Sequence, residues 1–248
     1  MKHTPVQNSS QSDETRDGHR SPAANQALLV ALNDAEKDPS KPDHSLVRQW
    51  IPIVTFGEAV GFSIPAVVGI ATAAAPAAVA LPALVVAGAA EGAVLGLAQA
   101  TALRRALPDL SRSRWVLSTA AAAAFAYTLG MAPSTWASPI THWPPIPTVA
   151  VVSLLAVAIL LSIGTAQYSV LRTVTADAGH WIWITALAWL AGLAVFMGFA
   201  TPLWHDGQSA PLAIGIGLLG GLFMAATTST LTGLGLRLIL PLSILHRR

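Results

Sequence analysis

The chain is 248 residues long, and its composition is that of a membrane protein rather than a soluble one. Hydrophobic residues make up 53% and charged residues 10%, whereas a soluble domain carries about 25% charged residues. Cysteine is absent, which excludes disulfides, thiolate metal sites and cysteine catalysis. The pI of about 9.4 does not indicate nucleic-acid binding, because the basic residues do not form a patch on a folded surface.

The N-terminal residues 1–47 form a polar segment in which acidic and basic side chains nearly balance. Its Ser, Asp, Asn and Pro content leaves too little apolar surface for independent folding, so we expect a disordered cytoplasmic tail. Residues 23–37 are the exception, because three leucines there could form one face of a short helix. The last residues, 241–248, are predicted to form a basic cytoplasmic tail.

Six apolar stretches follow the polar segment, and each reaches the roughly 17–25 helical residues that cross a hydrocarbon core about 30 Å thick. Prolines mark most of their ends, and Pro65 inside the first stretch is expected to kink it. We predict an all-α integral membrane protein with a transmembrane domain over residues 48–240. The predicted spans are Trp50–Ala74, Ala77–Leu103, Trp115–Met131, Pro147–Leu171, Trp181–Thr201 and Pro211–Leu238.

The loops between these spans differ in charge. The loops at 75–76, 132–146 and 202–210 contain no Lys or Arg, whereas the loops on the other side contain several arginines. Because cytoplasmic loops carry an excess of Lys and Arg, we predict a cell-membrane protein with both termini cytoplasmic. Residues predicted at the cytoplasmic interface are Arg104, Arg105, Arg112, Arg114, Arg172, Trp50, Trp115 and Trp181.

One phrase occurs twice in the apolar region. Gly96–Arg104 and Gly164–Arg172 share Gly, Ala, Gln, Leu and Arg at identical spacing, and each is followed by Trp-x-x-x-Thr, at Trp115 and Trp181. The first and last spans carry weaker versions. We interpret the phrase as a repeated hairpin and predict three hairpins in a bundle with pseudo-threefold symmetry about the membrane normal.

Hairpins that read G-x-A-Q-x-x-x-L-R and then W-x-x-x-T resemble a group of uncharacterised bacterial polytopic membrane proteins that carry such phrases in tandem. The resemblance covers about residues 48–240 and implies this architecture, but it implies no activity. In that group a Trp often follows the Gln, where this chain has Ala100 in one copy and Tyr168 in the other.

Two acidic residues lie deep within the predicted spans. Glu58 is roughly 12 Å beyond Trp50, and Glu91 is roughly 20 Å before Arg104, at about 1.5 Å per helical residue. An ionisable group at this depth costs several kcal/mol unless it is paired or hydrated, which makes it a functional candidate. The structural alternative is a protonated side chain bonded to a neighbouring helix, or an ion pair with Arg104 or Arg172.

Gln99 and Gln167 occupy equivalent positions on faces rich in small residues. We favour a packing role, in which an interhelical amide hydrogen bond contributes about 0.6–2 kcal/mol. The alternative is a ring of amides that coordinates a polar solute, which would form a polar path together with Glu58 and Glu91. Glycines with small-xxx-small spacing are predicted packing positions: Gly57, Gly61, Gly88, Gly92, Gly96, Gly164, Gly217 and Gly221.

Thr119 and Thr185 lie one turn beyond Trp115 and Trp181. A hydroxyl inside a helix commonly bonds the carbonyl four residues earlier. We therefore expect both hydroxyls to be satisfied within their own helices rather than by a ligand.

The sequence contains no catalytic or metal-binding motif: its histidines do not cluster, and it has no P-loop or nucleophile elbow. We therefore expect no enzyme, metal site or cofactor. The first hypothesis is a membrane-embedded transport or channel-like component for a proton, cation or small solute. The alternative is a non-catalytic accessory or scaffold protein. We expect the protein to contact the lipid bilayer and to bind a membrane protein, a cytoplasmic protein or a second copy of itself. We expect no binding to nucleic acid. An ABC-type permease subunit fits only in length and topology.

Overall fold

The computed structural model describes Gln26 and residues 44–104, 106–135, 143–205 and 207–245. The predicted helix at 23–37, apart from Gln26, and most of the predicted tail lie outside these residues. The described part is helical and contains no strand. Its long helices are α2 (His44–Ala71), α3 (Ala77–Leu103), α4 (Arg112–Thr135), α6 (Pro145–Leu171), α7 (His180–Ala200) and α8 (Ala210–Leu245), with short turns η1 (Ala176–Gly179) and η2 (Thr201–Leu203).

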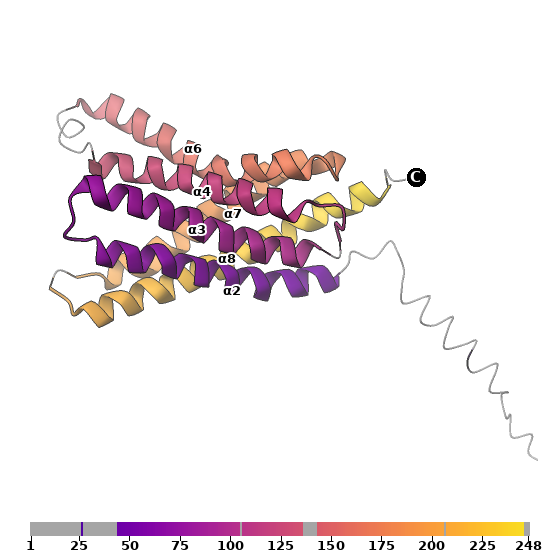
Figure 1. The fold of residues 1–248 in the computed structure, drawn as a ribbon, viewed down its shortest axis with the longest axis horizontal. Coiled ribbons are helices and arrows are strands. Elements are labelled where there is room, and N and C mark those ends of the chain that lie inside the picture. The colour runs from indigo at the N-terminus through magenta and orange to yellow at the C-terminus, as the bar shows by residue number, and fades with distance from the viewer. Residues whose placement is uncertain (1–25, 27–43, 105, 136–142, 206, 246–248) are drawn as a thin grey trace, which may run out of the picture. The chain divides into compact units, whose positions relative to one another are not determined.

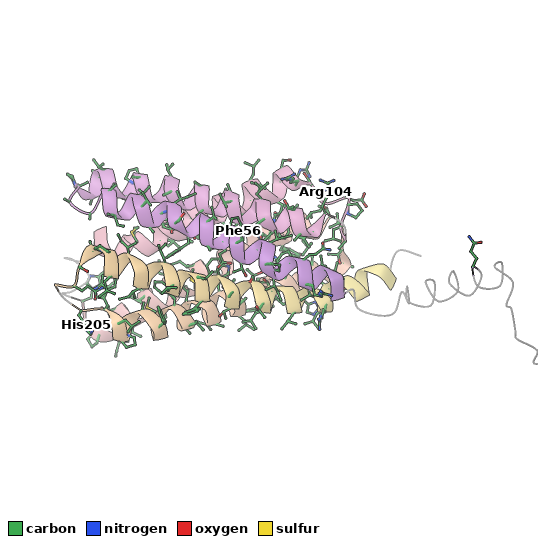
Figure 2. The ribbon with its side chains drawn as sticks, turned by 90° about the horizontal axis from the view of Figure 1, so that it is seen from below. Phe56, Arg104 and His205 are labelled. Carbon is green, nitrogen blue, oxygen red and sulfur yellow. The ribbon has the colours of Figure 1, made fainter. Side chains whose placement is uncertain are left out.

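The six long helices form a closed ring of antiparallel neighbours (Figure 1). Each packs against the next in the chain, and α8 packs against α2, which closes the ring. The start of α2 and the end of α8 therefore lie at the same end of the bundle (Figure 1). Figure 2 shows Arg104 at this end and His205 at the other. We call the first the arginine end.

Most of the long helices have the composition of membrane spans. Five segments are long and apolar enough to cross a membrane, in α2, α3, α6, α8 and the stretch from η1 through α7 to η2. Helix α4 is not among them, and it carries Arg112 and Arg114 in its first turn. Outward faces expose large apolar side chains such as Phe56, which is 73% exposed (Figure 2). Long helices that expose extensive apolar surface are typical of a multi-pass membrane protein.

The observed helix ends agree with the predicted ones in some helices and differ in others. Helix α3 has the predicted bounds, and α2 runs unbroken through Pro65. Because α2 begins at His44, the last residues assigned to the N-terminal tail are helical. Because α8 continues to Leu245, residues 241–245 of the predicted C-terminal tail are helical too. The apolar sequence continues beyond Arg237, and the helix does not end at this arginine.

The main cluster of buried apolar residues lies at the arginine end. It includes three tryptophans, together with the leucines that immediately precede the arginines ending α3 and α6. The corresponding leucine of α8, Leu236, is also buried. Close packing here fixes the six helices relative to one another.

Candidate functional site

Tryptophan and glutamine side chains meet inside the arginine end. Trp115 Nε1 donates to Gln99 Oε1 at 3.2 Å, and Trp181 Nε1 donates to Gln167 Oε1 at 2.8 Å. Each bond joins two neighbouring helices of the ring. The phrase that repeats in the sequence therefore repeats as a contact between a glutamine and the next tryptophan along the chain.

A third tryptophan completes this arrangement where the ring closes. Trp50 Nε1 donates to Thr232 Oγ1 at 3.1 Å, between α2 and α8. The Trp181 ring contacts the rings of both Trp50 and Trp115, with centroids 6.0 and 6.1 Å apart. We call these side chains the tryptophan–amide cluster; its members are Trp50, Gln99, Trp115, Gln167, Trp181 and Thr232.

The two glutamines also bond each other. Gln167 Nε2 donates to Gln99 Oε1 at 2.6 Å and to Thr119 Oγ1 at 2.9 Å. Both amides are buried, and they do not line the cavity described below. Their contacts fit the predicted packing role, and their place in a polar path is not supported.

The tryptophans of the cluster correct one interpretation of the sequence. Trp50, Trp115 and Trp181 were expected at the lipid interface, but each side chain is 0% exposed. Trp183, two residues after Trp181, is 64% exposed. Distance along a helix gives the depth of a residue but not the side of the helix on which it lies, so only the depth of the three tryptophans was predictable.

The predicted arginines lie at the surface. Arg104, Arg112, Arg114 and Arg172 are exposed, and Arg105 lies outside the described residues. The Arg172 guanidinium is 6.0 Å from the centroid of the Tyr168 ring, a cation–π distance. Because Arg104 and Arg172 are exposed at helix ends, the alternative in which they turn inward to pair with the buried glutamates is wrong.

Beyond the tryptophan–amide cluster, the ring contains a partly open cavity of about 300 Å³. Gly130, Leu193 and Met197 belong to its wall and are exposed, so the cavity reaches the surface of the bundle there. Among the described residues that line it, Glu91 is the one charged residue. Each long helix contributes to the wall, as shown by Phe62, Glu91, Tyr127, Ile163, Trp189 and Met224.

Glu91 is held in the cavity wall by its neighbours. It is 8% exposed, and the Tyr127 hydroxyl donates to its Oε2 at 2.7 Å. A Cβ atom at Gly61 would lie 3.3 Å from Glu91 Cγ, so the missing side chain lets Glu91 pack against α2. A Cβ at Gly88 would overlap the Tyr127 ring. Two of the predicted packing glycines, Gly61 and Gly88, therefore leave the space that Glu91 and Tyr127 occupy.

Glu58 lies next to the cavity but is sealed from it. Its side chain is 1% exposed, and neither carboxyl oxygen makes a hydrogen bond within the described residues. It is close enough to Glu91 and to the Thr228 hydroxyl to interact with both. The Thr228 hydroxyl donates to the Met224 carbonyl at 2.9 Å. A buried polar group without a partner is costly and requires an explanation.

Most predicted packing glycines lie where helices touch. A Cβ at Gly92 would lie 2.7 Å from the Thr119 carbonyl oxygen, and one at Gly164 would lie 2.9 Å from that of Ile182. Gly217 makes no such contact within the bundle, because a Cβ there would have no neighbouring atom within 4 Å; a contact of Gly217 with a second protomer stays a prediction. Glycines in close contact are Gly57, Gly61, Gly88, Gly92, Gly96, Gly164 and Gly221 as predicted, and also Gly192, Gly220, Gly233 and Gly235.

The two repeated threonines behave differently. The Thr119 hydroxyl donates to the Trp115 carbonyl at 2.8 Å, as predicted. The Thr185 hydroxyl is buried and has no hydrogen-bond partner among the described residues, so the same prediction is wrong there. The second copy therefore keeps the residue but not its hydrogen bond.

Tyr127 and Trp189 are site residues that the sequence did not reveal. Tyr127 is 36 positions from Glu91, and no local pattern connects them. Trp189 gave a weak signal, because it lies near the middle of the predicted span Trp181–Thr201. Within the described ranges, no three His, Asp or Glu residues lie close enough together to hold a metal ion.

No family model, curated protein or solved structure matches this chain.

Proposed function

We propose that the protein is a membrane-embedded transport or channel-like component whose central cavity receives a proton, a cation or a small solute. The observation that carries this proposal is a cavity shared by all six long helices with one buried carboxyl, Glu91, in its wall. Ionisable residues within membrane helices commonly mark ion and solute pathways, and small-molecule sites in bundles lie between the helices.

The two glutamates have different roles in this proposal. Glu91 is in the cavity wall and meets the solute, whereas Glu58 lies behind it on the neighbouring helix. The two carboxyls are close enough to interact, and in this proposal a proton passes between Glu91 and Glu58. The tryptophan–amide cluster, roughly 12 Å beyond Glu58 along α2, closes the path on the side of the arginine end.

The proposal includes the six-span topology. Helix α4 has 24 residues, which at about 1.5 Å per residue gives a length of roughly 36 Å. This exceeds the roughly 30 Å of a hydrocarbon core. With the arginine end on the cytoplasmic side of the cell membrane, as the distribution of arginines favours, the cavity faces the outside.

The three-hairpin, pseudo-threefold arrangement is also part of the proposal. Support comes from three equivalent hydrogen bonds, in which Trp115, Trp181 and Trp50 donate to a polar side chain at the same position of a neighbouring helix. We propose on the same basis that the chain is related to the bacterial polytopic proteins that carry such hairpins in tandem.

Flux in proteoliposomes tests the proposed function. A pH-sensitive dye inside the vesicles reports the decay of an imposed pH gradient, with the membrane potential clamped by potassium and valinomycin. We expect faster decay than in protein-free vesicles, and decay at the protein-free rate for Glu58→Gln and Glu91→Gln. Asp109→Asn, which removes an exposed carboxylate outside the cavity, is the matched control. Wild-type rates in both glutamate variants would contradict the proposal.

The scaffold alternative has partner helices pack against the small-residue grooves of the hairpins, and cytoplasmic proteins contact the tail and the arginine-rich loop. Because Gly57, Gly92 and Gly164 contact other helices of the same bundle, these three glycines do not support it. A stoichiometric partner captured in mild detergent, together with an absence of flux, would favour it.

A further inference from the structure

We infer that the central cavity binds a compact organic cation that carries one positive charge on an apolar or aromatic body. This inference rests on the proposed function, because it names the solute class of the same cavity. It follows from the charge, the chemical character and the size of the cavity.

The charge of the wall favours a cation. Glu91 lines the cavity, and no Lys, Arg or His does so among the described residues. Tyr127 donates to Oε2 of this carboxyl, and no described residue bonds Oε1, so a ligand can use that oxygen. An anion would face the carboxylate without a compensating positive charge.

The apolar character of the wall favours an organic cation over an inorganic one. Calcium takes six to eight oxygen ligands, and magnesium demands octahedral coordination, whereas this wall offers one carboxyl and one phenol. The aromatic residues Phe62, Trp189 and Phe196 also line the cavity. The faces of aromatic rings attract cations, and tryptophan does so most strongly. A solute with its own apolar surface satisfies both features.

The size of the cavity limits the solute. A volume of about 300 Å³ is at the lower end of the roughly 300–1,000 Å³ that is typical of small-molecule sites. It is the space of about ten water molecules at ~30 Å³ each. Benzyltrimethylammonium is a suitable probe, because it is compact, aromatic and permanently charged.

Calorimetric titration in lipid nanodiscs tests the inference with four probes. These are benzyltrimethylammonium, phenylmethanesulfonate with the opposite charge, benzyl alcohol without charge, and tetramethylammonium without the ring. We expect saturable binding of the first and much weaker binding of the other three. Equal binding of the sulfonate, or no saturable binding of benzyltrimethylammonium, would overturn the inference.

Two pairs of variants locate the binding. Glu91→Gln is expected to weaken benzyltrimethylammonium binding by at least about tenfold, whereas Asp109→Asn should not change it. Trp189→Leu is expected to weaken it by about fivefold. Its control is Trp183→Leu on the same helix, where the ring is 64% exposed on the outside of the bundle. Unchanged affinity in both cavity variants would refute the assigned site.

A second measurement does not require removal of Glu91. The chain has no cysteine, so a single cysteine can be introduced at Ala126 in the cavity wall, with Ala121→Cys on the exposed face of α4 as control. We expect Ala126→Cys to react faster with a trimethylammonium methanethiosulfonate than with a sulfonate one, and benzyltrimethylammonium to slow the reaction. A faster reaction with the sulfonate reagent would overturn the inference.

The results separate the inference from the proposed function. Selective, Glu91-dependent binding without flux of either protons or benzyltrimethylammonium would support the cation site and contradict transport. Glutamate-dependent proton flux without cation binding would support transport and contradict the cation site.

Discussion

The tryptophan–amide cluster and the central cavity are built from the same six helices at successive levels of the bundle, but they use polar residues in opposite ways. In the cluster, Gln99 and Gln167 bond each other and the tryptophan of the next helix. At the cavity, Glu91 accepts a bond from Tyr127 on one oxygen, and neither oxygen of Glu58 has a hydrogen-bond partner in the described part of the chain. In the cluster, the polar groups stabilise the fold through their hydrogen bonds. At the cavity, burial of the polar groups lowers the free energy of unfolding.

The repeated phrase makes the comparison sharper. If the copies are aligned on Gln99, Gln167 and Thr232, the position eight residues earlier is Glu91 in the first copy. It is Ile159 in the second and Met224 in the third, and all three line the cavity. Of three wall positions at the same spacing from the aligned residues, one thus carries an acidic side chain.

The largest effect on stability is expected for Gln167→Leu. This change removes hydrogen bonds to Gln99, Thr119 and Trp181, and leaves the buried indole N–H of Trp181 without an acceptor. We expect a loss of about 2–4 kcal/mol in the free energy of unfolding, measured by denaturation in mixed micelles. Ser169→Leu, on an exposed position of α6, should change it by less than about 0.5 kcal/mol. Equal effects would show that the cluster does not stabilise the bundle.

A change of one glycine tests close packing next to the cluster. A Cβ at Gly164 would lie 2.9 Å from the Ile182 carbonyl oxygen, so Gly164→Val must force α6 and α7 apart. We expect a loss of about 1–3 kcal/mol by the same measurement. Gly217→Val provides the matched control, because its added atoms would meet open space. A loss at Gly217 as large as that at Gly164 would contradict the assigned contacts.

The two regions also differ in how far the sequence predicts them. Both bounds of α3 were predicted correctly from the apolar run of residues 77–103 and the proline before it. Both signals are local, because they can be read within one segment of the sequence. The burial of Trp50, Trp115 and Trp181 was missed, although their repetition together with the glutamines was a usable signal for pairing. The bond between Tyr127 and Glu91 and the cavity depend on side chains from distant helices, so no local pattern indicated them.

Glu58→Leu tests whether the buried carboxyl beside the cavity lowers the stability of the protein. The change replaces a buried carboxyl without hydrogen bonds by an apolar side chain of similar size. We expect the free energy of unfolding to stay the same or to rise by about 1–2 kcal/mol, while proton flux is lost. The corresponding change in the cluster, Gln99→Leu, should lower it. A loss of more than about 1 kcal/mol for Glu58→Leu would show that this carboxyl supports the fold.

The smallest expected effect distinguishes two threonines at equivalent positions of the repeat. Thr119 accepts a bond from Gln167 and donates one to the Trp115 carbonyl, whereas the Thr185 hydroxyl is buried without a partner among the described residues. Because valine keeps the shape of threonine without its hydroxyl, Thr119→Val should cost about 1 kcal/mol and Thr185→Val should be neutral or slightly stabilising. Chemical denaturation of both variants under one condition measures the difference directly. Equal losses would mean that Thr185 has a partner such as an internal water, and that both copies of the repeat are satisfied alike.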